Sequence, residues 1–249
     1  MNRRLWLAVG VLAVLIVSGG CLDYVPGFNE IEEDALDEEP AAPYDWETDR
    51  NVTLTLDSGS QFRGVYNVSA DQRLRLYQPT SIGQEGPLDI SAVRFRYENG
   101  TVINGTELRD RGEIEQTPDE VDVTVPADGQ LAFTAGAIPR RLTLPVYVEG
   151  THEVVLPEGS RMDFFLFSNT VPSGATTERV DNRVRVTWEN VDSNSILVQY
   201  YQNNDLTIFG AVLGVLSAIA VGGLYYYRRQ IDRLHATRVE MGLNEGDDE

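Results

Sequence analysis

Short runs in which apolar and polar residues alternate dominate the sequence between residues 50 and 205. Alternation with a period of two places one face of a β-strand on a core and the other in water. The apolar positions of the clearest runs are Val52/Leu54/Leu56, Val93/Phe95/Tyr97, Leu142/Leu144/Val146/Val148, Val184/Val186/Trp188 and Ile196/Val198/Tyr200. Turn sequences such as Asp57-Ser58-Gly59 and Asn99-Gly100 separate the runs. The pattern predicts an all-β, sandwich-like ectodomain of antiparallel sheet over residues 50–205.

A long polar segment, Glu107–Glu120, interrupts this alternation and has a composition that suits a short helix. Two arrangements fit the interruption. It is an excursion within one domain, or it separates two small β-units. We predict the single domain. Because the paired cysteines that mark antibody-type domains are missing from the sequence, the prediction stops at a sandwich-like fold.

Three phenylalanines, Phe164, Phe165 and Phe167, lie close together in the run RMDFFLFSN. Consecutive apolar residues in a strand indicate that both faces are covered, so we predict a strand buried in the core. The alternative is an apolar groove or a surface for a partner.

The stretch Leu206–Tyr227 carries no charge and exceeds the roughly 20 residues that a helix needs to span a bilayer. Asp205 precedes the stretch, and tyrosines flank both ends. Four arginines follow it: Arg228, Arg229, Arg233 and Arg238. Because positive charge marks the cytoplasmic side, we predict a single-pass transmembrane helix over residues 206–227, with the ectodomain outside and residues 228–249 as a cytoplasmic tail.

Small residues recur every fourth position along this predicted helix, at Gly210, Gly214, Ala218 and Gly222. On a helix this spacing forms one shallow stripe, where the backbone of another helix can approach closely. The stripe indicates a homodimer or a membrane-protein partner. Small residues are also common in transmembrane helices generally, so the alternative is a stripe without a partner.

Residues 1–21 have the layout of a secretory signal, with a basic start, an apolar run and small residues at the end. The apolar run, Leu5–Val17, is shorter than a membrane span. Arg3 and Arg4 before that run resemble a twin-arginine export signal, and the alternative is a general secretory signal.

The end of this segment, Ser18-Gly19-Gly20-Cys21, resembles a lipobox, in which the cysteine thiol takes a lipid and becomes the mature N-terminus. Ser18 departs from the aliphatic residue that usually opens the motif. We predict lipidation of Cys21 and hence an N-terminal lipid anchor, and the alternative is an uncleaved signal anchor. Cys21 is the one cysteine of the chain, so no disulfide can form within it.

Residues 22–49 contain 11 acidic residues and no basic ones, with prolines at three positions. So little apolar surface cannot offset the entropy of ordering the chain. We therefore predict a disordered acidic tether over residues 22–49 that spaces the ectodomain from the lipid. The alternative is a docking segment for a basic partner.

All 20 basic residues of the chain are arginines, and 39 acidic residues give it a formal charge of −19. The acids are spread along the chain, which indicates the solvated coat of a protein from a high-salt environment. The alternative is a surface that binds cations or a basic partner. Nucleic acid is excluded as a partner because the chain has no basic patch to neutralise phosphates.

Candidate chemistry in the ectodomain is sparse. Its single histidine, His152, lies beside Glu153 at the start of a predicted strand, and we predict an exposed edge position rather than a catalytic base. The sequence has no Gly-X-Ser-X-Gly motif, no paired histidines and no calcium-binding loop. We therefore predict no catalytic, cofactor or metal site.

Four Asn-X-Ser/Thr sequences mark candidate glycosylation sites on an exported chain: Asn51, Asn67, Asn99 and Asn104. Asn99 and Asn104 lie in Gly-containing turns and are the favoured pair.

Several segments together resemble an uncharacterised family of haloarchaeal membrane-anchored lipoproteins. They are YDW at Tyr44–Trp46, LDISAVRFRYENGTV at Leu88–Val102, VEGTHEVVLPEG at Val148–Gly159, the C-terminal span and the MGL of the tail. The resemblance covers nearly the whole chain. It implies a haloarchaeal source and anchoring at the membrane, and it implies no activity or site because the family is a domain of unknown function.

These features predict a cell-surface, membrane-anchored protein that is not an enzyme and that binds or supports a partner protein in or near the membrane. A receptor-like domain for a small extracellular solute is the first alternative. A surface enzyme such as a hydrolase is the second, because any two of the many acids could meet in space.

Overall fold

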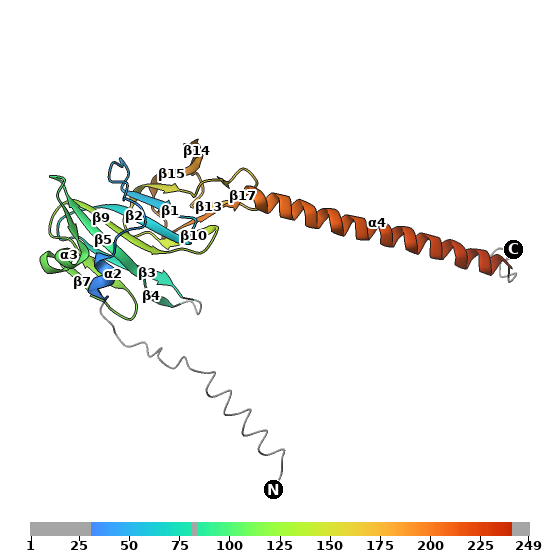
Figure 1. Cartoon of the computed structure of the whole chain (residues 1–249), viewed down its shortest axis with the longest axis horizontal. Helices are drawn as coiled ribbons and strands as arrows, with labels where there is room; N and C mark the ends of the chain where they lie inside the picture. Colours follow the sequence, from blue (N-terminus) through green and yellow to red (C-terminus); the bar gives the residue numbers. More distant parts are fainter. Residues whose placement is uncertain (1–30, 81–83, 241–249) are drawn as a thin grey trace, which may run out of the picture.

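The computed structural model describes residues 31–80 and 84–240. Figure 1 shows a β-rich ectodomain from which one long helix, α4 (Asn203–Glu240), projects. The predicted fold class, mostly antiparallel β-structure with one C-terminal apolar helix, is confirmed.

The largest sheet has eight strands in the order β14-β15-β11-β1-β2-β9-β5-β6. Their bounds are β1 (Val52–Leu56), β2 (Gln61–Val68), β5 (Ile90–Tyr97), β6 (Val102–Asn104), β9 (Gly129–Gly136), β11 (Gly150–Val155), β14 (Thr176–Val180) and β15 (Arg183–Val191). Neighbouring strands are antiparallel except β1 and β11, which run parallel with Val52 opposite His152.

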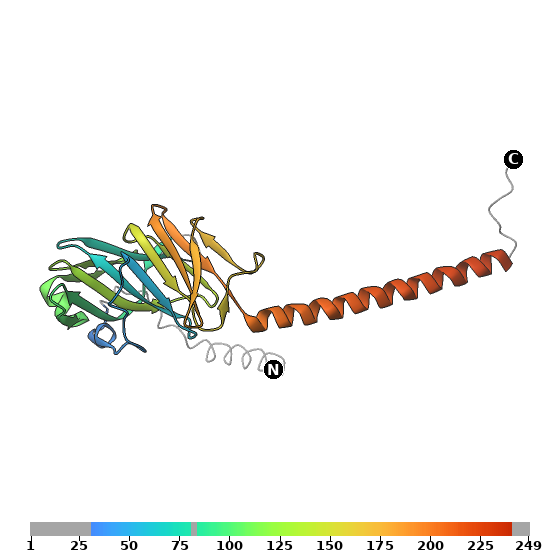
Figure 2. The same cartoon turned by 90° about the horizontal axis from the view of Figure 1, so that it is seen from above.

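Three smaller sheets complete the ectodomain. One is β4 (Glu85–Pro87), β3 (Arg73–Pro79), β8 (Val121–Thr124) and β7 (Glu113–Gln116). The others are β10 (Arg141–Pro145), β16 (Ser195–Gln199) and β13 (Asn169–Val171), and the pair β12 (Ser160–Arg161) and β17 (Tyr201–Gln202). Figure 2 shows the strands of the ectodomain gathered into one body, and α4 leaves from one end of it.

One hydrophobic core joins these sheets. It takes apolar residues from the large sheet, from β3 and β8, and from β10 and β16. At its centre the Tyr66 ring stacks on Phe133, with 5.2 Å between the centroids. The Tyr147 hydroxyl donates to the Tyr77 carbonyl oxygen over 2.6 Å. The two halves of the ectodomain sequence thus share one sheet and one core.

The polar interruption at residues 107–120 forms the helix α3 (Gly105–Arg111) and then β7. The Asn104 side chain caps the helix by accepting from the Glu107 backbone N–H over 2.9 Å. An oxygen at this position satisfies an amide that has no partner within the helix. Strands that precede and follow α3 pair in the large sheet, so the interruption is an excursion within it.

The predicted disordered tether is wrong for its described part, residues 31–49. This segment contains the short helix α2 (Glu33–Asp37), whose Leu36 side chain is fully buried (0% exposed). A Cβ added to Gly105 would lie 2.8 Å from the Leu36 Cβ, so the two segments touch. Further along, the buried Tyr44 hydroxyl donates to the Ala92 carbonyl oxygen over 2.6 Å. Residues 22–30 lie outside the described residues.

Hydrogen bonds to Arg94 of the large sheet and to the start of α3 explain why this acidic segment folds. Arg94 on β5 donates to the carbonyl oxygens of Asp37 and Glu38 over 3.1 and 2.9 Å. The Asp37 carboxylate accepts from the Thr106 backbone N–H over 2.9 Å. The few buried apolar side chains and these charge-assisted hydrogen bonds thus offset the entropy lost on ordering the segment. The average composition of the segment does not reveal either contribution.

The structure also corrects the prediction for His152. This residue lies in β11, in the interior of the large sheet, and is only 2% exposed. Its Nδ1 lies 2.9 Å from the Gly150 carbonyl oxygen. Burial lowers the pKa of the imidazole, while the carbonyls of Gly150 and Val148 partly oppose that shift. His152 is a core histidine. It lies in β11, which pairs with β15 along one edge and with β1 along the other, and its side chain is buried.

Candidate functional site

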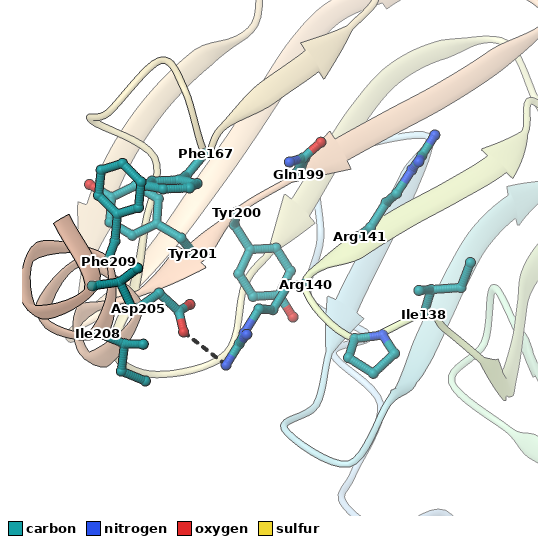
Figure 3. A pocket seen from close by; sticks show the side chains of 12 residues that line it. Ile138, Arg140, Arg141, Phe167, Gln199, Tyr200, Tyr201, Asp205, Ile208 and Phe209 are labelled. Atoms are coloured by element: carbon teal, nitrogen blue, oxygen red, sulfur yellow. Dashed lines mark ion pairs between the residues drawn. The ribbon is translucent and has the colours of Figure 1, made fainter. Parts of the chain in front are cut away.

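A hollow lies where α4 meets the ectodomain, and we call it the junction cavity. It has a volume of about 650 Å³. Figure 3 shows its lining, which comes from the turn before β10, from the end of β16 and β17, and from the first turns of α4. The lining residues are Ile138, Pro139, Arg140, Arg141, Phe167, Gln199, Tyr200, Tyr201, Asp205, Ile208, Phe209 and Val212.

Buried side chains and a backbone hydrogen bond hold the connection between the sheet and α4 in place. Tyr200 and Tyr201 are buried at the end of the sheet, directly before α4 begins. The Tyr200 backbone N–H donates to the Arg140 carbonyl oxygen over 3.1 Å. Arg140 itself has a φ of 62°, a conformation that a tight turn imposes and that L-residues rarely adopt. The turn before β10 is thereby tied to the root of the helix.

An ion pair ties the helix to the same turn. Arg140 Nη2 lies 3.0 Å from Asp205 Oδ1, as drawn in Figure 3. The other Asp205 oxygen accepts from the Gln202 backbone N–H over 2.8 Å. A carboxylate in the first turn of a helix also favours the helix dipole. Asp205 therefore joins the first turn of α4 to the ectodomain by two bonds.

Aromatic side chains form the second wall of the cavity. The Phe167 ring lies 5.2 Å from the Phe209 ring on α4 and 6.0 Å from the Tyr201 ring, measured between centroids. The Tyr201 hydroxyl donates to Asp163 Oδ1 over 2.6 Å, and this bond lowers the pKa of the Asp163 carboxyl. The cavity thus combines an apolar face on the helix with charged groups at its rim, which suits an amphipathic occupant.

The predicted strand around Phe164–Phe167 is wrong. The segment forms a turn in which the Phe167 backbone N–H donates to the Phe164 carbonyl oxygen over 3.0 Å. Phe164 and Phe167 are half-buried, whereas Phe165 and Leu166 are exposed. Consecutive apolar residues here mark a surface beside the helix, the alternative that the sequence left open, and not a core strand.

The small-residue stripe faces away from the junction cavity. Gly210 and Gly214 come two residues after Ile208 and Val212, which line the cavity, and two residues turn a helix by about 200°. Apart from its chain neighbours and the backbone of α4 itself, a Cβ added at Gly210, Gly214 or Gly222 would meet no atom of the described residues within 4 Å. The stripe is therefore open on the far side of α4, and the cavity and the stripe are separate features.

The other predicted residues are scattered. Asn99 is exposed in its turn, whereas the Asn104 Nδ2, where a glycan would attach, donates to Asp37 Oδ2 over 3.0 Å. Asn67 Nδ2 donates to the Arg50 carbonyl oxygen, and Asn51 Oδ1 accepts from Thr151. The four arginines that are predicted to set the topology lie on the last part of α4, and Cys21 with the predicted signal lies outside the described residues.

Sequence reasoning missed the junction cavity and its ion pair. Asp205 was visible as the last charge before the apolar stretch, but its partner is distant in the sequence. Within residues 31–80 and 84–240, no three His, Cys, Asp or Glu side chains gather in a way that could hold a metal ion.

A family model matches residues 48–246, which include the ectodomain from before β1 and all of α4. The chain belongs to DUF5803. It is described as a family of unknown function, so membership supplies no activity. No curated protein and no solved structure matches the chain. The resemblance to a family of unknown function is thus confirmed, while the haloarchaeal source and the lipid anchor stay predictions.

Proposed function

We propose that this DUF5803 protein is a cell-surface module that binds or supports a partner protein within the membrane, and that it does so without catalysis. The observation that carries the proposal is the bare helix α4. Its segment Asn203–Ile231 is long and apolar enough to cross a membrane, and none of its 18 most apolar consecutive residues is buried by the ectodomain. The ectodomain covers only the first turns of α4, so lipid or a partner helix must cover the rest.

The orientation follows from charge. Asp205 lies at the ectodomain end of the apolar segment, and Arg228 and Arg229 follow its other end. The positive-inside rule then places the ectodomain outside and the tail in the cytoplasm. The signal segment and the lipid on Cys21 that the sequence predicts would both agree with export.

The stripe supports a partner helix. Because an added Cβ there meets nothing, the backbone of a second helix can approach α4 along this side. The ion pair between Arg140 and Asp205 fixes the first turn of α4 to the ectodomain. A partner packed on the stripe would therefore be held in a defined orientation to the ectodomain.

Co-purification tests the proposal. In mild detergent at high salt, the tagged full chain should bring down one stoichiometric membrane protein or a second copy of itself. The double substitution Gly210→Leu with Gly214→Leu should abolish this association, because the added side chains keep the two backbones apart. Mass spectrometry and size-exclusion chromatography measure the loss.

The matched control is Ala220→Leu with Gly223→Leu. These residues are also small, but Ala220 lies about 200° round the helix from Ala218, and Gly223 about 180° from Gly214. The control should keep the partner. Association that survives the stripe substitutions, or that is equally lost in the control, would contradict the proposed role of the stripe.

A further inference from the structure

The turn Phe164–Phe167, which we call the aromatic loop, exposes its two central side chains. Phe165 is 80% exposed and Leu166 is 58% exposed. Single exposed apolar residues are ordinary on protein surfaces. Two adjacent ones at the tip of a turn, flanked by the half-buried rings of Phe164 and Phe167, form a continuous apolar projection.

Specific hydrogen bonds hold this projection. The Ser168 hydroxyl donates to the Met162 carbonyl oxygen over 2.7 Å, and the Ser168 backbone N–H donates to the Phe164 carbonyl oxygen over 3.1 Å. The bond between Tyr201 and Asp163 fastens the start of the loop to β17. Phe165 and Leu166 are therefore exposed because these hydrogen bonds close the turn behind them.

The position of the aromatic loop decides what can cover it. Phe167 packs edge to face on Phe209, with 5.2 Å between the ring centroids, and Phe209 belongs to the apolar segment of α4. Figures 1 and 2 both place the loop, drawn in gold, at the end of the ectodomain from which α4 leaves. The loop thus lies beside the part of the helix that enters the membrane.

We propose that the aromatic loop inserts into the outer leaflet of the bilayer, with Phe165 and Leu166 below the headgroups. Lipid is the occupant because the loop continues an apolar surface that the span already presents to the membrane. Phe and Leu side chains are the kind that interfacial segments bury at the boundary between headgroups and acyl chains. The charged Arg161 and Asp163, which are 3.7 Å apart across their ion pair, directly precede the loop and remain at headgroup level.

Insertion gives the ectodomain a second contact with the membrane beside α4. Two contacts prevent the ectodomain from tilting about the root of the helix, and they keep the junction cavity at the level of the headgroups. The inference rests on α4 spanning the membrane. It does not depend on a partner at the stripe.

Depth-dependent quenching tests the insertion. The full chain, with Cys21→Ser to leave no other cysteine, carries Phe165→Cys labelled with an environment-sensitive dye. It is reconstituted into phosphatidylcholine vesicles at high salt, with or without a lipid bearing a nitroxide near its headgroup. The dye at residue 165 should emit at shorter wavelength than in water, and the nitroxide lipid should quench it at least twofold.

Three controls separate the outcomes. The same dye on Val102→Cys, at an exposed position of β6, should show neither effect. The dye on Leu216→Cys, in the middle of α4, should report the bilayer interior. Adding Leu166→Asp to the Phe165→Cys chain should remove the quenching, because a charge at the tip opposes insertion.

Blue-shifted emission from the dye at residue 216 without quenching at residue 165 would overturn the insertion and leave the anchor in place. A blue-shifted dye at residue 165 that the nitroxide lipid does not quench would also overturn it, because a protein surface would then cover the loop. Emission from the dye at residue 216 at the wavelength it has in water would contradict the membrane span itself.

Discussion

Replacing Leu36 by alanine should lower the free energy of unfolding by about 3 kcal/mol, the typical cost of removing a fully buried leucine side chain. Leu36 is the one buried residue of α2 and rests on Gly105 at the start of α3. Its loss would remove the apolar contact that holds residues 31–38 on the ectodomain. Urea unfolding of the full chain in detergent, followed by tryptophan fluorescence, measures the change.

Asp34→Ala is the matched control for this substitution. Asp34 lies in the first turn of the same helix but is exposed, so its loss should cost only a few tenths of a kcal/mol. A loss below about 1 kcal/mol for Leu36→Ala would show that the segment does not contribute to the core, since buried Leu→Ala substitutions cost 2–5 kcal/mol.

Replacing Asp57 by alanine should cost about 3 kcal/mol, because it leaves the buried Arg63 guanidinium without its carboxylate. This is the low end for a buried ion pair, since the Asp57 side chain is 27% exposed. Arg63 on β2 has a side chain that is 8% exposed, and its Nη2 lies 3.1 Å from Asp57 Oδ1. Its Nε and Nη1 have no hydrogen-bond partner within the described residues. The Asp57 ion pair is therefore the main compensation for a charge removed from water.

The pair of Arg63 and Asp57 is less exposed than the surface ion pairs, so its loss should cost more stability. Glu189, which is 82% exposed, lies 3.1 Å from Arg50, and Glu189→Ala should change stability by less than about 0.5 kcal/mol. High salt should leave the effect of Asp57→Ala nearly unchanged, because a buried pair is weakly screened. Equal costs for the two substitutions, measured by the same urea unfolding, would contradict this account of Arg63.

The regular strands could be predicted because their signal is local. In β5 and β15, alternate side chains such as Phe95 and Trp188 face the core, so apolar residues recur at every second position of the sequence. The apolar span of α4 is equally local. Hydropathy over consecutive residues is sufficient to identify both kinds of element.

The remaining features depend on contacts between distant segments. Residues 31–49 are acidic on average, and only the position of Arg94 on β5, more than fifty residues later, shows what orders them. The burial of His152 depends on strands that pair on both sides of β11. The exposure of Phe165 depends on the turn beside α4, since an apolar run alone does not separate a core strand from a membrane-facing loop.

The ordered segment also changes the predicted double anchor. Because residues 31–49 pack on the ectodomain, only residues 22–30 separate Cys21 from the described body, and nine residues span at most about 30 Å. Figure 1 places α2 at the end of the ectodomain remote from the root of α4. A lipid on Cys21 would therefore hold that end close to the membrane, because residues 31–49 of the predicted tether are folded.

The central claim is that α4 holds the ectodomain outside the membrane, and epitope accessibility on intact cells tests it most directly. One epitope is inserted in the exposed turn at Glu158-Gly159 and another after Glu249. In the cells that make the protein, antibody should reach the first epitope without permeabilisation and the second only after it. The reverse pattern, or a first epitope that stays inaccessible until the cells are permeabilised, would contradict the account.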